Sequence, residues 1–183
     1  MSRFVPIQHR GTPSIGPPDT TLRIVRLGFC GQISQVVTMR FEATTIIAAP
    51  PALAFEFLAD FTRDSEWKSD CVSCELVDGD GSAGSKLHYV SKILGKTSVS
   101  DSEIDSYEAD RSISFKLLEG RPASGWRTFE PVDGGTRVTV GYELDLSVMF
   151  GPLGAMVAAI GKRQVTHDLE TAKVILEHAV AAA

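Results

Sequence analysis

The sequence has few cysteines and no long apolar run, and each shortage excludes a class of protein. Only Cys30, Cys71 and Cys74 occur among 183 residues, and no secretory signal is recognisable. An odd number of cysteines without such a signal predicts a reducing, cytoplasmic location and not a disulfide-bonded secreted domain. The apolar stretch 148–161 is shorter than the roughly 18 residues that a membrane-spanning helix needs, so no transmembrane segment is expected.

Basic residues are scarce after the first forty positions. Residues 1–40 contain five arginines against the single acid Asp19, and the remainder contains 13 basic and 22 acidic residues. A domain this acidic repels phosphate backbones, so we expect no nucleic acid partner.

Metal-binding and cofactor motifs are also missing. Cys71 and Cys74 have CxxC spacing, but no second cysteine pair or histidine pair follows to complete a structural zinc site. We favour an ordinary packing role for these two cysteines, with metal binding or redox chemistry as the alternative. No cofactor is predicted.

The chain divides near residue 40. Residues 1–39 are basic, begin rich in proline and glycine, and show no period, so we expect a disordered or loosely attached extension. The domain at 40–183 opens with a β-branched run at 40–48 that predicts a strand. Pro50-Pro51 ends this strand and suits the start of a helix. A second short helix or turn then carries Trp67.

Six further strands are expected where alternating or β-branched segments end at turn signals. They lie at 71–77, 86–93, 96–107, 112–118, 126–132 and 136–147. Because short turns join consecutive strands, the strands should form an antiparallel meander. Apolar residues at helical spacing from Leu153 to Gln164 predict a long helix that extends to about residue 178.

Three segments carry a family resemblance. They are "IIAAPPALAFEFLADFTRDSEW", with Leu58, Asp60 and Trp67, then "SYEADRSISFKL", and the hairpin "FEPVDGGTRVTVGYELDL". Over about residues 40–178 the sequence resembles the START-like (SRPBCC) helix-grip superfamily, in the branch of polyketide cyclase/dehydrase and lipid-transport proteins. Ala109 or Asp110 stands where this family often has proline.

The resemblance implies an α+β fold. It consists of a curved seven-stranded antiparallel sheet wrapped around the C-terminal helix, with two short helices between strands 1 and 2. An apolar cavity is implied between the sheet and the helix. No catalytic residue can be carried over, because the working residues of this superfamily differ from branch to branch.

Arg127 is the most informative single residue in the expected sheet. If Phe129 faces inward, alternation along the strand turns Arg127 inward as well. A buried arginine needs a carboxylate partner, and we expect Glu103, Glu143 or an acidic group of a ligand. The alternative is the opposite register, with Trp126 inward and Arg127 in solvent.

The expected ligand-lining residues combine apolar side chains with aromatic rings that carry one polar atom, as is typical of binding pockets. For each aromatic residue taken alone, core packing is the alternative. The full set comprises Trp67, Leu87, Tyr89, Ser91, Phe115, Arg127, Phe129, Tyr142, Leu144, Met156, Ile160 and Gln164.

The sequence therefore predicts a protein that binds or transports a hydrophobic small molecule, such as a lipid, a polyketide or an aromatic metabolite. One alternative is a cyclase or dehydratase acting on a polyketide-like substrate, with Arg127 at an enolate oxygen and a tyrosine exchanging protons. No general base is evident for that reaction. Another alternative is a protein-interaction subunit, which an exposed apolar patch on the C-terminal helix would favour. Catalytic turnover and homodimer formation are left open.

Overall fold

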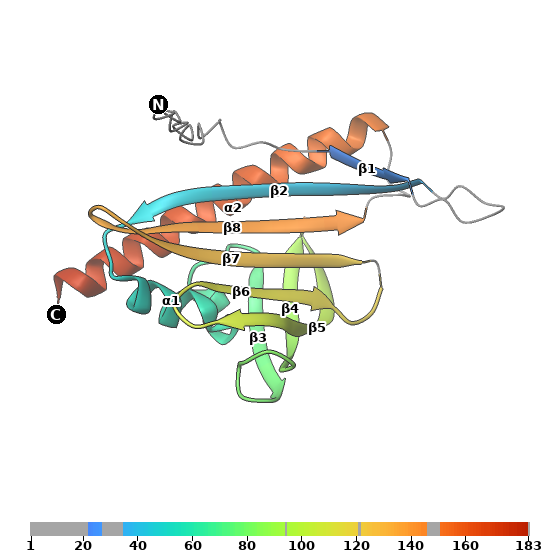
Figure 1. Ribbon diagram of the computed structural model, residues 1–183. Helices are drawn as coiled ribbons and strands as arrows, with labels where there is room; N and C mark the ends of the chain where they lie inside the picture. The colour runs from blue at the N-terminus through green and yellow to red at the C-terminus, as the bar shows by residue number, and fades with distance from the viewer. Residues whose placement is uncertain (1–21, 27–34, 94, 121, 146–150, 183) are drawn as a thin grey trace, which may run out of the picture.

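The computed structural model describes residues 22–26, 35–93, 95–120, 122–145 and 151–182 (Figure 1). Eight strands, two α-helices and one 3₁₀ helix lie within these residues. In chain order they are β1 (Leu22–Arg26), β2 (Gln35–Ile47), α1 (Pro51–Ala59), η1 (Phe61–Glu66), β3 (Cys71–Asp78), β4 (Lys86–Ile93), β5 (Lys96–Glu108), β6 (Ser112–Leu117), β7 (Ala123–Val132), β8 (Gly135–Asp145) and α2 (Gly151–Ala181).

The strands form one antiparallel sheet in the order β1-β2-β8-β7-β6-β5-β4-β3. The seven expected strands are β2 to β8, so the helix-grip prediction is confirmed. β1 adds an eighth strand beside β2, with Leu22 opposite Met39. β1 and the start of β2 fall within residues 1–39, whose role as an extension stays a prediction.

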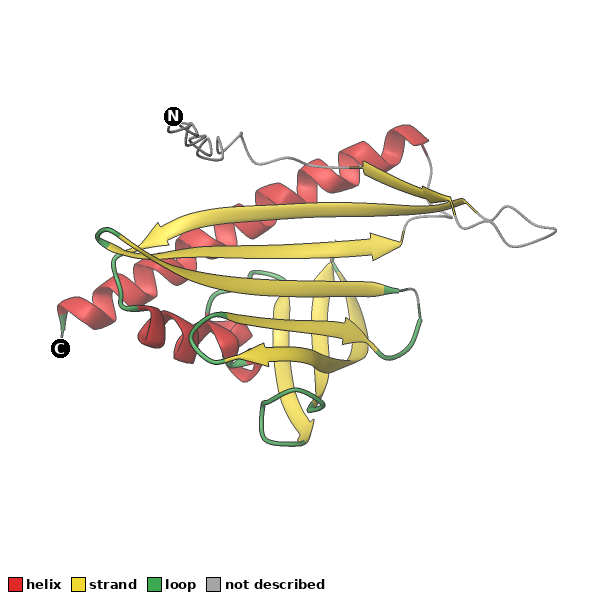
Figure 2. Cartoon of the chain, viewed as in Figure 1, coloured by secondary structure: helices red, strands yellow, loops and turns green. Residues whose placement is uncertain are grey.

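The sheet is strongly curved, and the curvature creates a concave face. Figure 2 shows β3 and β4 running across the direction of β2 and β8. Register shifts interrupt β3 twice and separate Ile104 from Ser106 on β5. Such shifts are β-bulges, which bend a strand and increase its local twist.

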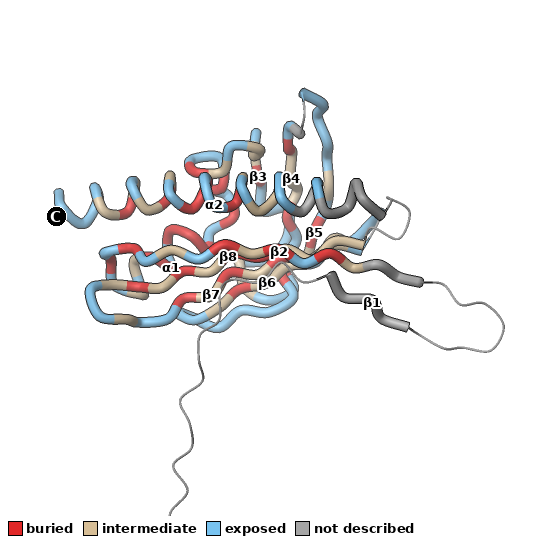
Figure 3. Tube along the Cα trace, turned by 90° about the horizontal axis from the view of Figure 1, so that it is seen from above, coloured by how far each residue is buried: buried red, intermediate tan, exposed pale blue. Residues whose placement is uncertain are grey.

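Helix α2 packs along the concave side of β2 and β8, as the view from above shows (Figure 3). Its buried residues Val165, Leu169, Ala172 and Leu176 recur at helical spacing and face the sheet. No helix within the described part of the chain is long and apolar enough to cross a membrane.

Arg127 links the sheet to the segment that contains α1 and η1. Its side chain is 2% exposed, so the predicted inward orientation is confirmed. Nη2 donates a hydrogen bond of 2.7 Å to Oδ2 of Asp64 on η1, and Nη1 donates to the carbonyl oxygen of Leu58. The guanidinium also lies over the rings of Phe61 and Trp67, at 4.2 and 5.1 Å from the ring centroids.

The partner that we expected for Arg127 was wrong. Glu103 lies instead beside Lys116, with 3.4 Å between Oε1 and Nζ, and both side chains are partly exposed. Asp64, and not Glu103 or Glu143, is the carboxylate partner of Arg127. It lies 63 positions before Arg127 in the chain, and η1 brings it against the sheet.

Replacing Arg127 by methionine should strongly destabilise the fold. The change leaves the Asp64 carboxylate buried without its cation, and breaking a buried ion pair in this way costs about 3–5 kcal/mol. Urea unfolding followed by circular dichroism measures the loss. As a matched control, Arg137→Met removes an exposed pair with Glu130 (3.1 Å), which should cost less than about 1 kcal/mol. Equal losses for the two variants would contradict a structural role for the buried pair.

Candidate ligand-binding site

Two adjoining pockets lie along the sheet, and the second of them extends under α2. The first, which we call the sheet pocket, has a volume of about 210 Å³ and extends from η1 across β4 to β8. The second, the helix pocket, has a volume of about 260 Å³ and extends beneath α2. Lys68, Asp70, Tyr142 and Leu144 line both pockets and form their junction.

The structure places eight of the twelve predicted lining residues at these pockets. The alternation of residues along β4 and β8 correctly predicted which of their side chains face inward. The sheet pocket contains Leu87, Tyr89, Ser91 and Phe115; Tyr142 and Leu144 line both pockets; Ile160 and Gln164 line the helix pocket. Whether these residues contact a ligand stays a prediction.

The other four predicted residues, Trp67, Arg127, Phe129 and Met156, line neither pocket. Trp67 and Arg127 are buried against each other. Phe129 packs edge-on against Phe55, with 5.1 Å between the ring centroids. Met156 is 53% exposed. The sequence did not indicate this exposure, because the amphipathic pattern of a helix does not reveal where the sheet beneath it ends. With Ile160, which is 54% exposed, Met156 forms the apolar patch that we associated with a protein-interaction role.

The sequence analysis missed Lys68, the main polar side chain at the junction. The Lys68 side chain is only 9% exposed, and its Nζ lies 3.7 Å from Oδ2 of Asp64. The ammonium group also faces the rings of Tyr89 and Tyr142, at 4.9 and 5.4 Å from their centroids. The only signal in the sequence was its position directly after Trp67, since η1 has no periodic pattern that would show a buried face.

The electrostatic surroundings keep Lys68 charged. Burial lowers the pKa of its ammonium group, but attraction to nearby acidic groups, the Asp64 and Asp70 carboxylates among them, outweighs this effect. The pKa of Lys68 therefore lies well above its usual value. Burial also raises the pKa of the Tyr89 hydroxyl, which stays protonated.

Three polar atoms at the sheet pocket are buried without a hydrogen-bond partner among the described residues. They are Oδ1 of Asp64, Oδ1 of Asp70 and the hydroxyl oxygen of Tyr89. A buried polar group without a partner costs about 1–3 kcal/mol. These atoms have almost no accessible surface, so a polar group that entered the pocket could form the missing bonds only after a small shift of the side chains.

Two glycines shape the pocket walls by close approach. A Cβ at Gly125 would lie 2.5 Å from Cε1 of Phe115 and 3.1 Å from Cδ1 of Tyr142, so only glycine leaves room for both rings. On α2, a Cβ at Gly161 would lie 2.9 Å from Cζ of Phe41. Gly161 therefore brings the helix close to β2 at the edge of the helix pocket.

Asp168 connects α2 to the turn after η1. The backbone N–H of Ser69 donates a hydrogen bond of 3.0 Å to Oδ1 of Asp168, which is 2% exposed. Burial raises the pKa of this carboxyl group. The turn that carries Lys68 is thus bound to the sheet through Asp64 and to the helix through Asp168.

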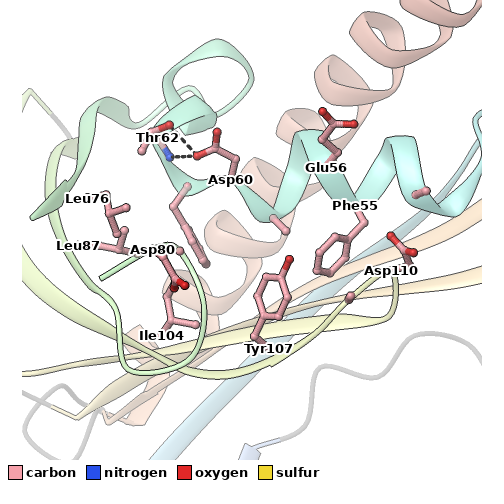
Figure 4. A pocket seen from close by; sticks show the side chains of 15 residues that line it. Phe55, Glu56, Asp60, Thr62, Leu76, Asp80, Leu87, Ile104, Tyr107 and Asp110 are labelled. Carbon is pink, nitrogen blue, oxygen red and sulfur yellow. Dashed lines mark hydrogen bonds between the residues drawn. The ribbon is translucent and has the colours of Figure 1, made fainter. Parts of the chain in front are cut away.

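A third pocket, of about 620 Å³, lies beneath α1 (Figure 4). Phe55 and Tyr107 pack edge-on there, with 5.3 Å between the ring centroids. We call it the outer pocket. Its polar lining includes four carboxylates and no basic side chain, and it shares two lining residues, Phe61 and Leu87, with the sheet pocket. The four carboxylates belong to Glu56, Asp60, Asp80 and Asp110.

Neither cysteine of the CxxC segment has the surroundings of a reactive thiol. Burial raises the pKa of Cys71 and raises the pKa of Cys74 to about 12, whereas redox-active thiols have lowered values. Among the described residues, no group of three or more histidine, cysteine or acidic side chains is arranged to hold a metal ion.

Residues 38–177 match the family described as polyketide cyclase / dehydrase and lipid transport. The chain belongs to this family. A search of curated proteins gave no significant match.

Solved structures share the fold of this family member. The Zhui aromatase/cyclase from Streptomyces sp. R1128 superposes with a TM-score of 0.66 at 19% identity, covering 78% of this chain and 96% of that one. A START superfamily protein from Mycobacterium smegmatis has a TM-score of 0.62 at 16% identity, covering 76% and 97%. TTHA0849 from Thermus thermophilus has a TM-score of 0.60 at 21% identity, covering 78% and 97%. Identities this low establish the shared fold alone.

Two glycines on the sheet, Gly125 on β7 and Gly141 on β8, provide a test of the pocket wall. Gly125→Ala pushes on Phe115 inside the sheet pocket, whereas Gly141→Ala pushes on the indole ring of Trp126. Overpacking of this kind costs about 1–3 kcal/mol, so thermal unfolding should show both variants destabilised.

Only Gly125→Ala should change the affinity for a fluorescent apolar probe, because Trp126 lines neither pocket. Equal changes in probe affinity for the two variants would argue against the sheet pocket as the binding site.

Proposed function

We propose that this protein binds a hydrophobic small molecule in the joined sheet and helix pockets. The observation that carries the proposal is the junction, where a buried ammonium and unpartnered polar atoms open into two mainly apolar pockets. Such a combination is typical of small-molecule sites, in which apolar walls surround a few polar groups that fix orientation. Membership of a family described by lipid transport and polyketide chemistry supports the same conclusion.

The affinity would come mainly from the apolar walls. Removing apolar surface from water contributes about 25 cal/mol per Å². Phe115 and Leu87 supply apolar surface to the sheet pocket, and Phe41, Ile160 and Val165 supply it to the helix pocket. The polar junction between the two pockets would then set the position of the ligand along them.

Native mass spectrometry of the purified protein, followed by organic extraction, tests the proposal directly. We expect a small hydrophobic molecule to co-purify, or an apolar fluorescent probe to bind in its place. Absence of both would overturn the binding function.

Filling the junction should abolish this binding. Leu144 lines both pockets, so Leu144→Trp places an indole where the ligand would lie. We expect at least about tenfold weaker probe binding, measured by fluorescence titration. Val99→Trp is the matched control, because Val99 is 57% exposed and lines neither pocket. Unchanged binding by the Leu144 variant, with the fold intact, would contradict this location of the site.

A second candidate is a cyclase or dehydratase, and Asp70 is the observation that favours it. The sequence offered no general base, but in the structure Asp70, whose Oδ1 is buried without a hydrogen-bond partner, lines the junction with Lys68. Asp70 could take a proton from a carbon beside a carbonyl group, and the Lys68 ammonium could stabilise the enolate oxygen.

This enzymatic candidate predicts a specific kinetic defect. Asp70→Asn should lower the turnover of an enolisable polyketide mimic by about 10²–10⁴-fold and leave its binding nearly unchanged. Steady-state kinetics combined with a binding titration separates the two effects. If the unaltered protein shows no turnover of such mimics, the binding function stands alone.

A further inference from the structure

The junction contains charged groups that set requirements on the polar end of a ligand. Lys68 is the one ammonium group among the described residues that lines both pockets. The 3.7 Å between its Nζ and Asp64 is too long for a hydrogen bond, and Oδ2 of Asp64 is already used by Arg127. The tyrosine rings face the ammonium group through their π-faces, which accept no conventional hydrogen bond.

The charges that surround Lys68 are already more than balanced by carboxylates. Lys68 and Arg127 are the cations, and Asp64, Asp70 and Asp168 are the acids at or beside the two pockets. The remaining polar lining residues, which are serines, tyrosines and Gln164, are neutral. A ligand carboxylate would therefore add a further negative charge to a poorly solvated cluster.

The outer pocket also has more carboxylates than cations in its lining. It adjoins the sheet pocket through Phe61 and Leu87, and its charged lining residues are all acidic. These four carboxylates are exposed and therefore screened by solvent, so the charge that disfavours an anion in the sheet pocket comes mainly from the acids beside Lys68. An oxygen that accepts a hydrogen bond without carrying a charge fits Lys68 better.

We propose that Lys68 anchors a neutral carbonyl oxygen of the ligand, while the free Oδ1 of Asp70 accepts a hydrogen bond from a hydroxyl group of the same ligand. This inference rests on the proposed binding function and names its ligand class: hydrophobic hydroxylated ketones or esters, and not carboxylic acids. The raised pKa of Lys68 agrees with a permanent donor, since a charged ammonium has no lone pair with which to attack the carbonyl carbon.

Four probes on one ring system test the proposal, with binding measured by calorimetry. They are 2-methylnaphthalene, 2-acetonaphthone, 2-naphthol and sodium 2-naphthoate. The ketone should bind about tenfold more tightly than the hydrocarbon, because its carbonyl oxygen accepts a hydrogen bond from the charged ammonium group of Lys68. The naphthol should also exceed the hydrocarbon, and the naphthoate should bind more weakly than the ketone.

Variants assign each preference to its residue. Lys68→Met should remove the preference for the ketone over the hydrocarbon. Asp70→Ala should remove the preference for the naphthol. Lys86→Met is the matched control, because Lys86 is exposed on β4 and lines neither pocket. The infrared carbonyl band of the bound ketone in the unaltered protein should shift to lower frequency, a measurement that does not depend on the folding of any variant.

The outcomes separate this inference from the function on which it rests. If no naphthalene probe binds, the binding function itself fails. If hydrocarbon and ketone bind equally, or the ketone preference survives in Lys68→Met, binding stands but the role of Lys68 is refuted. Tighter binding of the naphthoate than of the ketone would show that Lys68 anchors an anion, which also overturns the proposal.

Discussion

The buried ion pair between Arg127 and Asp64 is the interaction on which the interior of this protein depends. It joins the middle of the sheet to η1, and the same guanidinium holds the end of α1 through the carbonyl oxygen of Leu58. Because Asp64 also lies beside Lys68, the pair keeps a second cation close to the pockets. A buried pair contributes little net stability by itself, but it makes the position of η1 specific.

The arrangement of the strands could be predicted because it depends on local patterns. β4 has the predicted bounds, Lys86–Ile93, and its alternation correctly turned Leu87, Tyr89 and Ser91 inward. The junction could not be predicted in this way. Lys68 and Asp70 belong to the exit from a 3₁₀ helix, where no period distinguishes a buried face from an exposed one, and their surroundings come from strands far along the chain.

The same limit explains the errors around Arg127 and Met156. Alternation left two registers open for Arg127, and the structure has the inward one; a choice among carboxylates also needs the path of η1, which the sequence pattern does not contain. Helical spacing likewise grouped Met156 with Ile160 and Gln164 on one face, although the exposure of Met156 depends on how far the sheet extends beneath α2. Both the partner of Arg127 and the exposure of Met156 depend on tertiary contacts and not on secondary structure.

The two attachments of the turn at residues 64–70 have a mechanical consequence. Asp64 fixes one end of this turn to the sheet, and Ser69 fixes the other end to Asp168 on the helix. The turn therefore acts as a spacer that sets the separation of the two layers at this point. Any movement that opens the helix from the sheet must stretch or break one of these bonds. Two further hydrogen bonds bind α2 to the end of β2, from Thr45 Oγ1 to Glu170 Oε1 and from the N–H of Ala48 to Glu177 Oε1, so the turn shares this role with the C-terminal half of the helix.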